Sequence, residues 1–122
     1  MQKFAVIVAS LLFCGVSHAA SVVCTGSMLN YEFIVSAKTA SSKVAGSAMV
    51  VVKKSGTVTE KGALPIVDSQ FTPNQALRFT AQGPDSRVVI STTYSAPGQY
   101  NGTMSLGGQG MGTTVSTTCN VR

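Results

Sequence analysis

Apolar side chains recur at every second position along most of this chain, and this spacing limits the possible folds more than any other feature. Alternate residues of a β-strand point to the same face, whereas side chains on one face of a helix are spaced by about 3.6 residues. Beyond residue 19, no stretch keeps helical spacing for three turns. The sequence therefore predicts an all-β protein.

Several segments are expected to be strands because they alternate or are rich in valine. The expected strands cover residues 28–37, 44–54, 77–82, 87–95, 99–106 and 113–121. In the first of these, Leu29 is expected to share the apolar face with Tyr31 and Phe33. Residues 57–61 and 63–67 form either two short strands or one bent strand. Pro65 has no amide hydrogen to donate and suggests a sheet edge there.

Turn residues separate these segments, so the C-terminal half is expected to form an antiparallel meander of four strands. Val22 and Cys24 have the same offset as Cys119 and Val121, which places the first strand beside or across from the last. About seven or eight strands fit either a small antiparallel β-barrel or a two-sheet β-sandwich. Cysteines near the two ends of the chain favour the barrel, because a sandwich disulfide more often joins interior strands.

The first 19 residues are expected to be a cleaved signal peptide rather than part of the fold. Lys3 precedes an uncharged apolar run, residues 4–16, and small residues stand at the −3 and −1 positions before a cleavage site after Ala19. Two alternatives are a retained membrane anchor and a lipoprotein signal acylated at Cys14. The run is shorter than the roughly 20 residues of a spanning helix, and bulky Phe13 precedes the cysteine. Residues 20–122 then form one domain without a transmembrane segment.

Removal of this leader leaves 103 residues with a formal net charge of +4, two cysteines and no histidine. Cys24 and Cys119 are expected to form one disulfide in an oxidising compartment, periplasmic or extracellular, with two free thiols as the alternative. A redox role would favour a closely spaced CxxC pair, which the chain lacks. The bridge is therefore expected to be structural.

The side chains that most catalytic and metal sites use are scarce after processing. Nucleophilic catalysis and a zinc or copper site both lack histidine and free thiol. The four carboxylates are scattered over different segments, so they suggest neither a glycosidase pair nor a calcium site; they are Glu32, Glu60, Asp68 and Asp85. The sequence predicts a protein that is not an enzyme and has no catalytic residue, metal or cofactor.

A glycine-rich segment is a candidate mobile contact loop, with an ordinary hairpin loop as the plainer alternative. It consists of Gly107, Gly108, Gln109, Gly110, Met111 and Gly112. No lysine and no helix follow it, so it does not qualify as a phosphate-binding loop. Asn101 heads a glycosylation sequon that matters only in a eukaryotic source.

Five of the eight cations expected in the processed chain form a candidate basic surface: Lys38, Lys43, Lys53, Lys54 and Lys61. Such a patch attracts an anionic envelope component, whereas lysines at strand edges can instead prevent unwanted pairing. Nucleic acid is not expected as a partner of an exported protein, and the region also lacks interleaved aromatic residues. The favoured hypothesis is a monomeric, non-catalytic binding or inhibitory domain with an unknown protein or an anionic envelope component as partner. The alternative is a structural or surface-assembly subunit.

Overall fold

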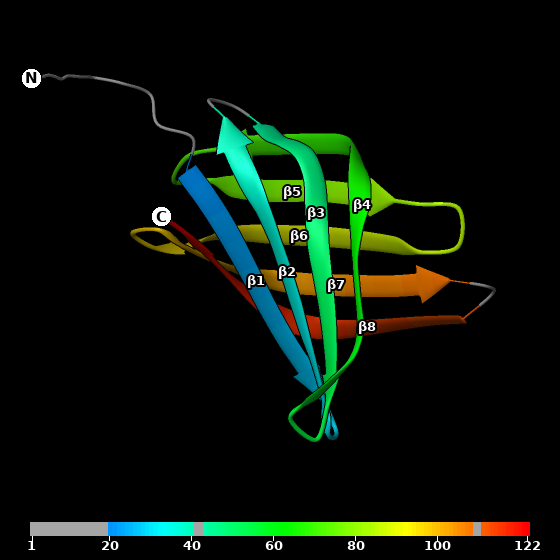
Figure 1. Cartoon of the computed structure of the whole chain (residues 1–122). Helices are drawn as coiled ribbons and strands as arrows, with labels where there is room; N and C mark the ends of the chain where they lie inside the picture. The colour runs from blue at the N-terminus through cyan, green and yellow to red at the C-terminus, as the bar shows by residue number, and fades with distance from the viewer. Residues whose placement is uncertain (1–19, 41–42, 109–110) are drawn as a thin grey trace, which may run out of the picture.

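Eight antiparallel strands follow one another around a closed barrel, each paired with its neighbours in sequence, and β8 pairs with β1 (Figure 1). The computed structural model describes residues 20–40, 43–108 and 111–122; the expected signal peptide, residues 1–19, lies outside the described residues. The strands are β1 (Ala20–Met28), β2 (Tyr31–Ala40), β3 (Lys43–Lys54), β4 (Thr57–Thr72), β5 (Ala76–Gln82), β6 (Arg87–Ala96), β7 (Gln99–Gly108) and β8 (Met111–Val121). This confirms the all-β prediction and selects the barrel over the sandwich. None of the described segments forms a helix long and apolar enough to cross a membrane.

The barrel closes where β1 and β8 lie side by side, and the predicted disulfide joins them there. Cys24 and Cys119 are directly opposite in the register, with their Cα atoms 3.9 Å apart. Neither side chain is accessible to solvent. Val22 and Val121, whose offsets from the two cysteines match, also pair directly. The disulfide therefore holds the two ends of the meander together inside the barrel.

The barrel is flattened into two layers whose strands cross at a steep angle (Figure 1). β1, β2, β3 and the first part of β4 form one layer, and β5 to β8 form the other. β4 is the bent strand that the sequence left as one of two alternatives. It pairs with β3 as far as Pro65 and with β5 from Ile66 onward. Pro65 thus lies where β4 changes partner, a position that a residue without an amide hydrogen tolerates.

Aromatic side chains fill the end of the barrel near the β4–β5 and β6–β7 turns. Tyr100 packs edge-to-face against Phe71 and Tyr94, with ring centroids 5.9 Å apart in both pairs. Its hydroxyl accepts a hydrogen bond of 2.9 Å from the backbone N–H of Asn74. We call this the closed end of the barrel. The remaining core consists of the inward-facing apolar residues of all eight strands, for example Leu77 and Ile90.

The expected inward position of Leu29 is wrong. β1 ends at Met28 and β2 begins at Tyr31, which pair with each other across a two-residue turn. Leu29 occupies this turn with a φ of 56°. Its side chain is 92% exposed. The expected strand 28–37 therefore combines the end of one strand, a turn and most of the next strand.

Candidate functional site

The two layers separate at the end of the barrel opposite the closed end, and we call this the open end. β1 pairs with β8 only as far as Gly26, beyond which β1 continues beside β2 while β8 continues beside β7. A Cβ atom on Gly26 would lie 2.7 Å from the side chain of Val115 and 2.8 Å from the carbonyl oxygen of Ser116. Glycine is therefore required where the two strands diverge.

A cleft of about 930 Å³ opens between the separated layers. Its apolar wall is made of Tyr31, Phe33, Val50, Val52, Leu64, Val88 and Leu106. The first layer supplies five of these side chains and the second layer supplies the last two. Most of them are only half-buried, in contrast to the fully buried core residues. The cleft is thus an extension of the hydrophobic core that reaches solvent.

Charged residues surround this cleft on both layers: Lys54, Glu60, Asp85 and Arg87, with Lys61 at the rim, where its pairing with Val51 turns the side chain to the outer face. The Nζ atom of Lys54 lies 5.7 Å from the centre of the Tyr31 ring, within the range of a cation–π contact. The Tyr31 and Phe33 rings are parallel, with centroids 6.3 Å apart. The cleft therefore combines an aromatic and aliphatic wall with charges of both signs at its mouth.

The glycine-rich segment contributes backbone to this cleft. Gly107 and Gly112 pair directly and both line the cleft, as does Gly108. A side chain at Gly108 would overlap the carbonyl oxygen of Asp85 in the β5–β6 turn. Met111 pairs with Gly108, whereas Gln109 and Gly110 lie outside the described residues. The small residues let the β7–β8 hairpin approach the neighbouring turn closely.

The structure divides the candidate basic surface into two parts. Lys38, Lys43, Lys53 and Lys61 alternate with inward-facing residues and lie on the outer face of the first layer. Lys54 belongs to the opposite face and lies at the mouth of the cleft. The five lysines are close in sequence, but they do not form one surface.

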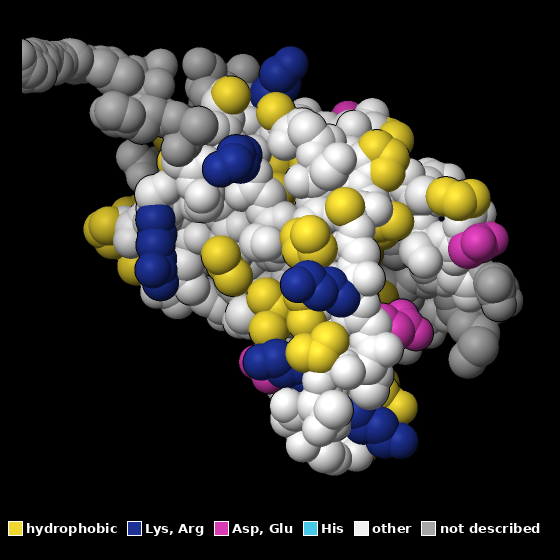
Figure 2. Space-filling view, in the orientation of Figure 1, with side chains coloured by type: hydrophobic (Ala, Val, Ile, Leu, Met, Phe, Trp, Pro, Cys, Tyr) yellow, Lys and Arg dark blue, Asp and Glu magenta, His cyan; other side chains and the backbone are white. Residues whose placement is uncertain are grey.

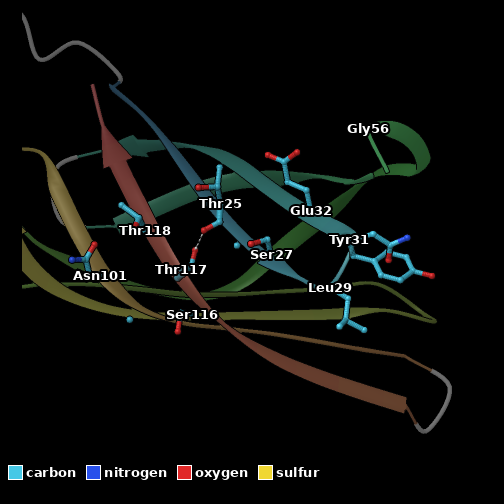
Figure 3. A pocket seen from close by; sticks show the side chains of 13 residues that line it. Thr25, Ser27, Leu29, Tyr31, Glu32, Gly56, Asn101, Ser116, Thr117 and Thr118 are labelled. Atoms are coloured by element: carbon cyan, nitrogen blue, oxygen red, sulfur yellow. Dashed lines mark hydrogen bonds between the residues drawn. The ribbon is translucent and has the colours of Figure 1, made fainter. Parts of the chain in front are cut away.

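A second depression, of about 840 Å³, lies on the outside of the β1–β8 junction. Figure 3 shows side chains from β1, β2, β7 and β8 around it, and most of them carry a hydroxyl, amide or carboxylate group. The hydroxyl of Thr117 donates a 2.8 Å hydrogen bond to the backbone oxygen of Thr25. Asn101 is exposed here and its amide donates to the hydroxyl of Ser95. This depression lacks an apolar wall comparable to that of the cleft.

The described residues contain no histidine, and both of their cysteines are in the disulfide. Within the same residues, no three His, Cys, Asp or Glu side chains gather closely enough to hold a metal ion. Sequence reasoning predicted the disulfide, grouped five lysines that lie on two different faces, and missed the cleft. A scan of protein-family models, a search of curated proteins and a search of solved structures each found no match to this chain.

Proposed function

We propose that this protein is an exported, non-catalytic binding module that takes an apolar group of its ligand or partner into the open-end cleft. The observation that carries the proposal is a cleft walled by apolar side chains in a barrel that is otherwise packed. Leaving apolar surface in contact with water forgoes about 25 cal/mol for each Å², so a ligand that covers this wall gains that free energy. The mouths of β-barrels are frequent sites for such ligands.

The surrounding framework supports this role because it holds the cleft walls in place before binding. The disulfide fixes β1 against β8, and each other strand pairs with its neighbours in sequence. A wall that is already ordered loses little conformational freedom when a ligand binds. Charges of both signs at the mouth, such as Lys54 and Asp85, would orient a polar group of the ligand.

A location outside the cytosol fits a buried structural disulfide, because exported proteins meet an oxidising environment. The predicted leader supports the same location. Monomeric behaviour remains a prediction, and the alternative of a surface-assembly subunit has one observation in its favour. Residues 112–116 of β8 have a described partner on the β7 side only, which leaves one backbone edge free.

The test is a fluorescence titration with dansylaminoundecanoic acid, an amphiphile whose emission rises in an apolar environment. The wild-type protein is expected to bind this probe saturably. Leu106→Glu replaces part of the apolar wall with a charged carboxylate and is expected to weaken binding by at least about tenfold. Val52→Thr has nearly the same shape as the wild type and is expected to weaken binding by a few-fold while preserving the fold.

The matched control is Val67→Glu, because Val67 is 59% exposed and lies outside the cleft. This variant is expected to bind the probe like the wild type. Circular dichroism and size-exclusion chromatography of all samples report folding and association. Absence of saturable binding by the wild type, or equal binding by all folded variants, would contradict the proposal. Growth of the particle size with concentration would favour the assembly alternative.

A further inference from the structure

We infer that the outer face of the first layer docks on an anionic lipid bilayer. This face lies on the other side of the layer from the cleft, so the inference is independent of the proposed function. It carries the outward-pointing lysines Lys38, Lys43, Lys53 and Lys61, and we call it the lysine face. Figure 2 shows this face with basic side chains distributed around a group of hydrophobic side chains.

The register places the apolar side chains in the centre of the lysine face. Ser36 of β2 pairs with Val23 on one side and Met49 on the other, and the next outward row on β2 and β3 is Ile34 beside Val51. Val23 is 36% exposed and Met49 is 38% exposed. Apolar side chains at this exposure, bordered by cations, form a surface that can bind both apolar groups and anions.

The lysines lie around this centre and have few acidic neighbours. Lys61 pairs with Val51, and Lys38 pairs with Ala45, so neither faces a carboxylate across the strands. Glu32 is the one acidic side chain that the described register places on this face, directly opposite Lys53. The lysine face therefore has an excess of positive charge.

Protection of strand edges can account for Lys61, which lies in the part of β4 that pairs only with β3, but not for Lys38 and Lys53. Lys38 is in β2 and Lys53 is in β3, and both strands are paired on their two sides within the barrel. A gatekeeping lysine is useful on an unpaired edge, where it prevents another chain from adding a strand. These two lysines instead project from the middle of a sheet. Their role is better explained by a partner that contacts the outer face of the sheet.

An anionic bilayer complements both properties of the lysine face. Its headgroups present many negative charges in one plane, and each lysine near such a surface raises the binding constant by about fivefold. The lysine stems cover apolar surface while their ammonium groups reach the headgroups. The central apolar side chains can then approach the boundary of the acyl chains. An acidic protein would need an apolar area that matches the centre of the lysine face in position, whereas a bilayer offers charge and apolar depth across its whole plane.

The experiment is co-sedimentation of the exported protein with vesicles, after mass spectrometry has established its N-terminus. Vesicles of phosphatidylglycerol mixed with phosphatidylcholine are compared with vesicles of phosphatidylcholine alone, at low and high salt. Binding is expected only to the anionic vesicles and is expected to weaken with salt, because screening shortens the reach of the charges. Combining Lys38→Gln, Lys53→Gln and Lys61→Gln is expected to weaken binding by on the order of 100-fold.

The matched control is Arg78→Gln, compared with Lys38→Gln alone, because each removes one charge and Arg78 lies on β5, outside both the lysine face and the cleft. Lys38→Gln is expected to weaken binding about fivefold and Arg78→Gln less than about twofold. Thermal melting establishes that the triple variant and both single variants fold. Equal losses in the two single variants would show that net charge alone attracts the protein and would overturn the inference. Absence of vesicle binding, or equal binding to neutral vesicles, would overturn it as well.

Discussion

Gly102 illustrates at the scale of one residue how closely the strands of this barrel approach one another. A Cβ atom at this position would overlap the backbone carbonyl oxygen of Ser91 and lie 2.7 Å from the Cα atom of Thr92. The hydroxyl of Thr92 is itself buried and donates to the backbone oxygen of Leu77 at 2.8 Å. The backbone of β6 therefore occupies the space that a side chain on β7 would need.

Gly102→Ala is expected to lower the free energy of unfolding by about 1–3 kcal/mol, the usual effect of overpacking. Urea denaturation monitored by circular dichroism measures this change. Gly62→Ala is the control, because no heavy atom lies within 4 Å of the Cβ that it introduces. This control is expected to change stability by less than about 0.5 kcal/mol. Similar losses of unfolding free energy in the two variants would show that the close approach of the β6 backbone is not the reason why position 102 requires glycine.

At the scale of elements, the junction of β1 and β8 is the shortest ladder in the described register and the one that the disulfide reinforces. It has five register pairs, from Val22↔Val121 to Gly26↔Thr117, whereas β7 and β8 share ten. Without the bridge, the ends of β1 and β8 would depend on this short ladder. Because the two cysteines are 95 positions apart, the disulfide closes nearly the whole described chain into a loop.

Replacing Cys24 and Cys119 together by alanine is expected to lower the free energy of unfolding by about 4 kcal/mol in the chain-entropy description. Urea denaturation measures the total loss. Hydrogen exchange measures its location, since the amides of β1 and β8 should lose more protection than those of β5 and β6. A uniform loss of protection would show that the bridge acts only on the unfolded chain and does not reinforce the junction.

The elements were largely predictable from the sequence because alternation and turn residues are local signals. Residues 77–82 and 99–106 correspond closely to β5 and β7. The prediction was wrong at Leu29, because alternation ignores backbone conformation and this residue adopts the left-handed region in a turn. The expected break between residues 54 and 57 is confirmed as the β3–β4 turn, where Ser55 and Gly56 are both at positive φ.

The candidate sites were less predictable because they depend on strand register and on how the layers diverge. The sequence grouped Lys53 with Lys54, but adjacent residues of a strand point to opposite faces, so only the former belongs to the lysine face. The cleft brings Phe33 near Leu106, which are far apart in the chain. Their proximity follows from the bend in β4, for which Pro65 is the one local signal, and from the short β1–β8 ladder, which has none.

At the scale of the whole molecule, the barrel has one end that is sealed and one that is open. Tyr100 and its aromatic neighbours seal the closed end. At the open end, β4 before Pro65 has its described partner in β3 only, and residues 112–116 of β8 have theirs in β7 only. Alternate amides of these two segments therefore have no strand partner among the described residues.

This asymmetry predicts an uneven distribution of hydrogen-exchange protection. Amides that alternate toward the unpaired side, in residues 57–63 and 112–116, are expected to exchange at least about 100-fold faster than those of β6, which is paired on both sides. Exchange monitored by nuclear magnetic resonance resolves the individual amides. Equal protection of these amides and those of β6 would mean that the layers close on one another in solution. In that case no cleft would exist to receive a ligand, whereas an unequal pattern that becomes more even when dansylaminoundecanoic acid binds would locate the ligand between the layers.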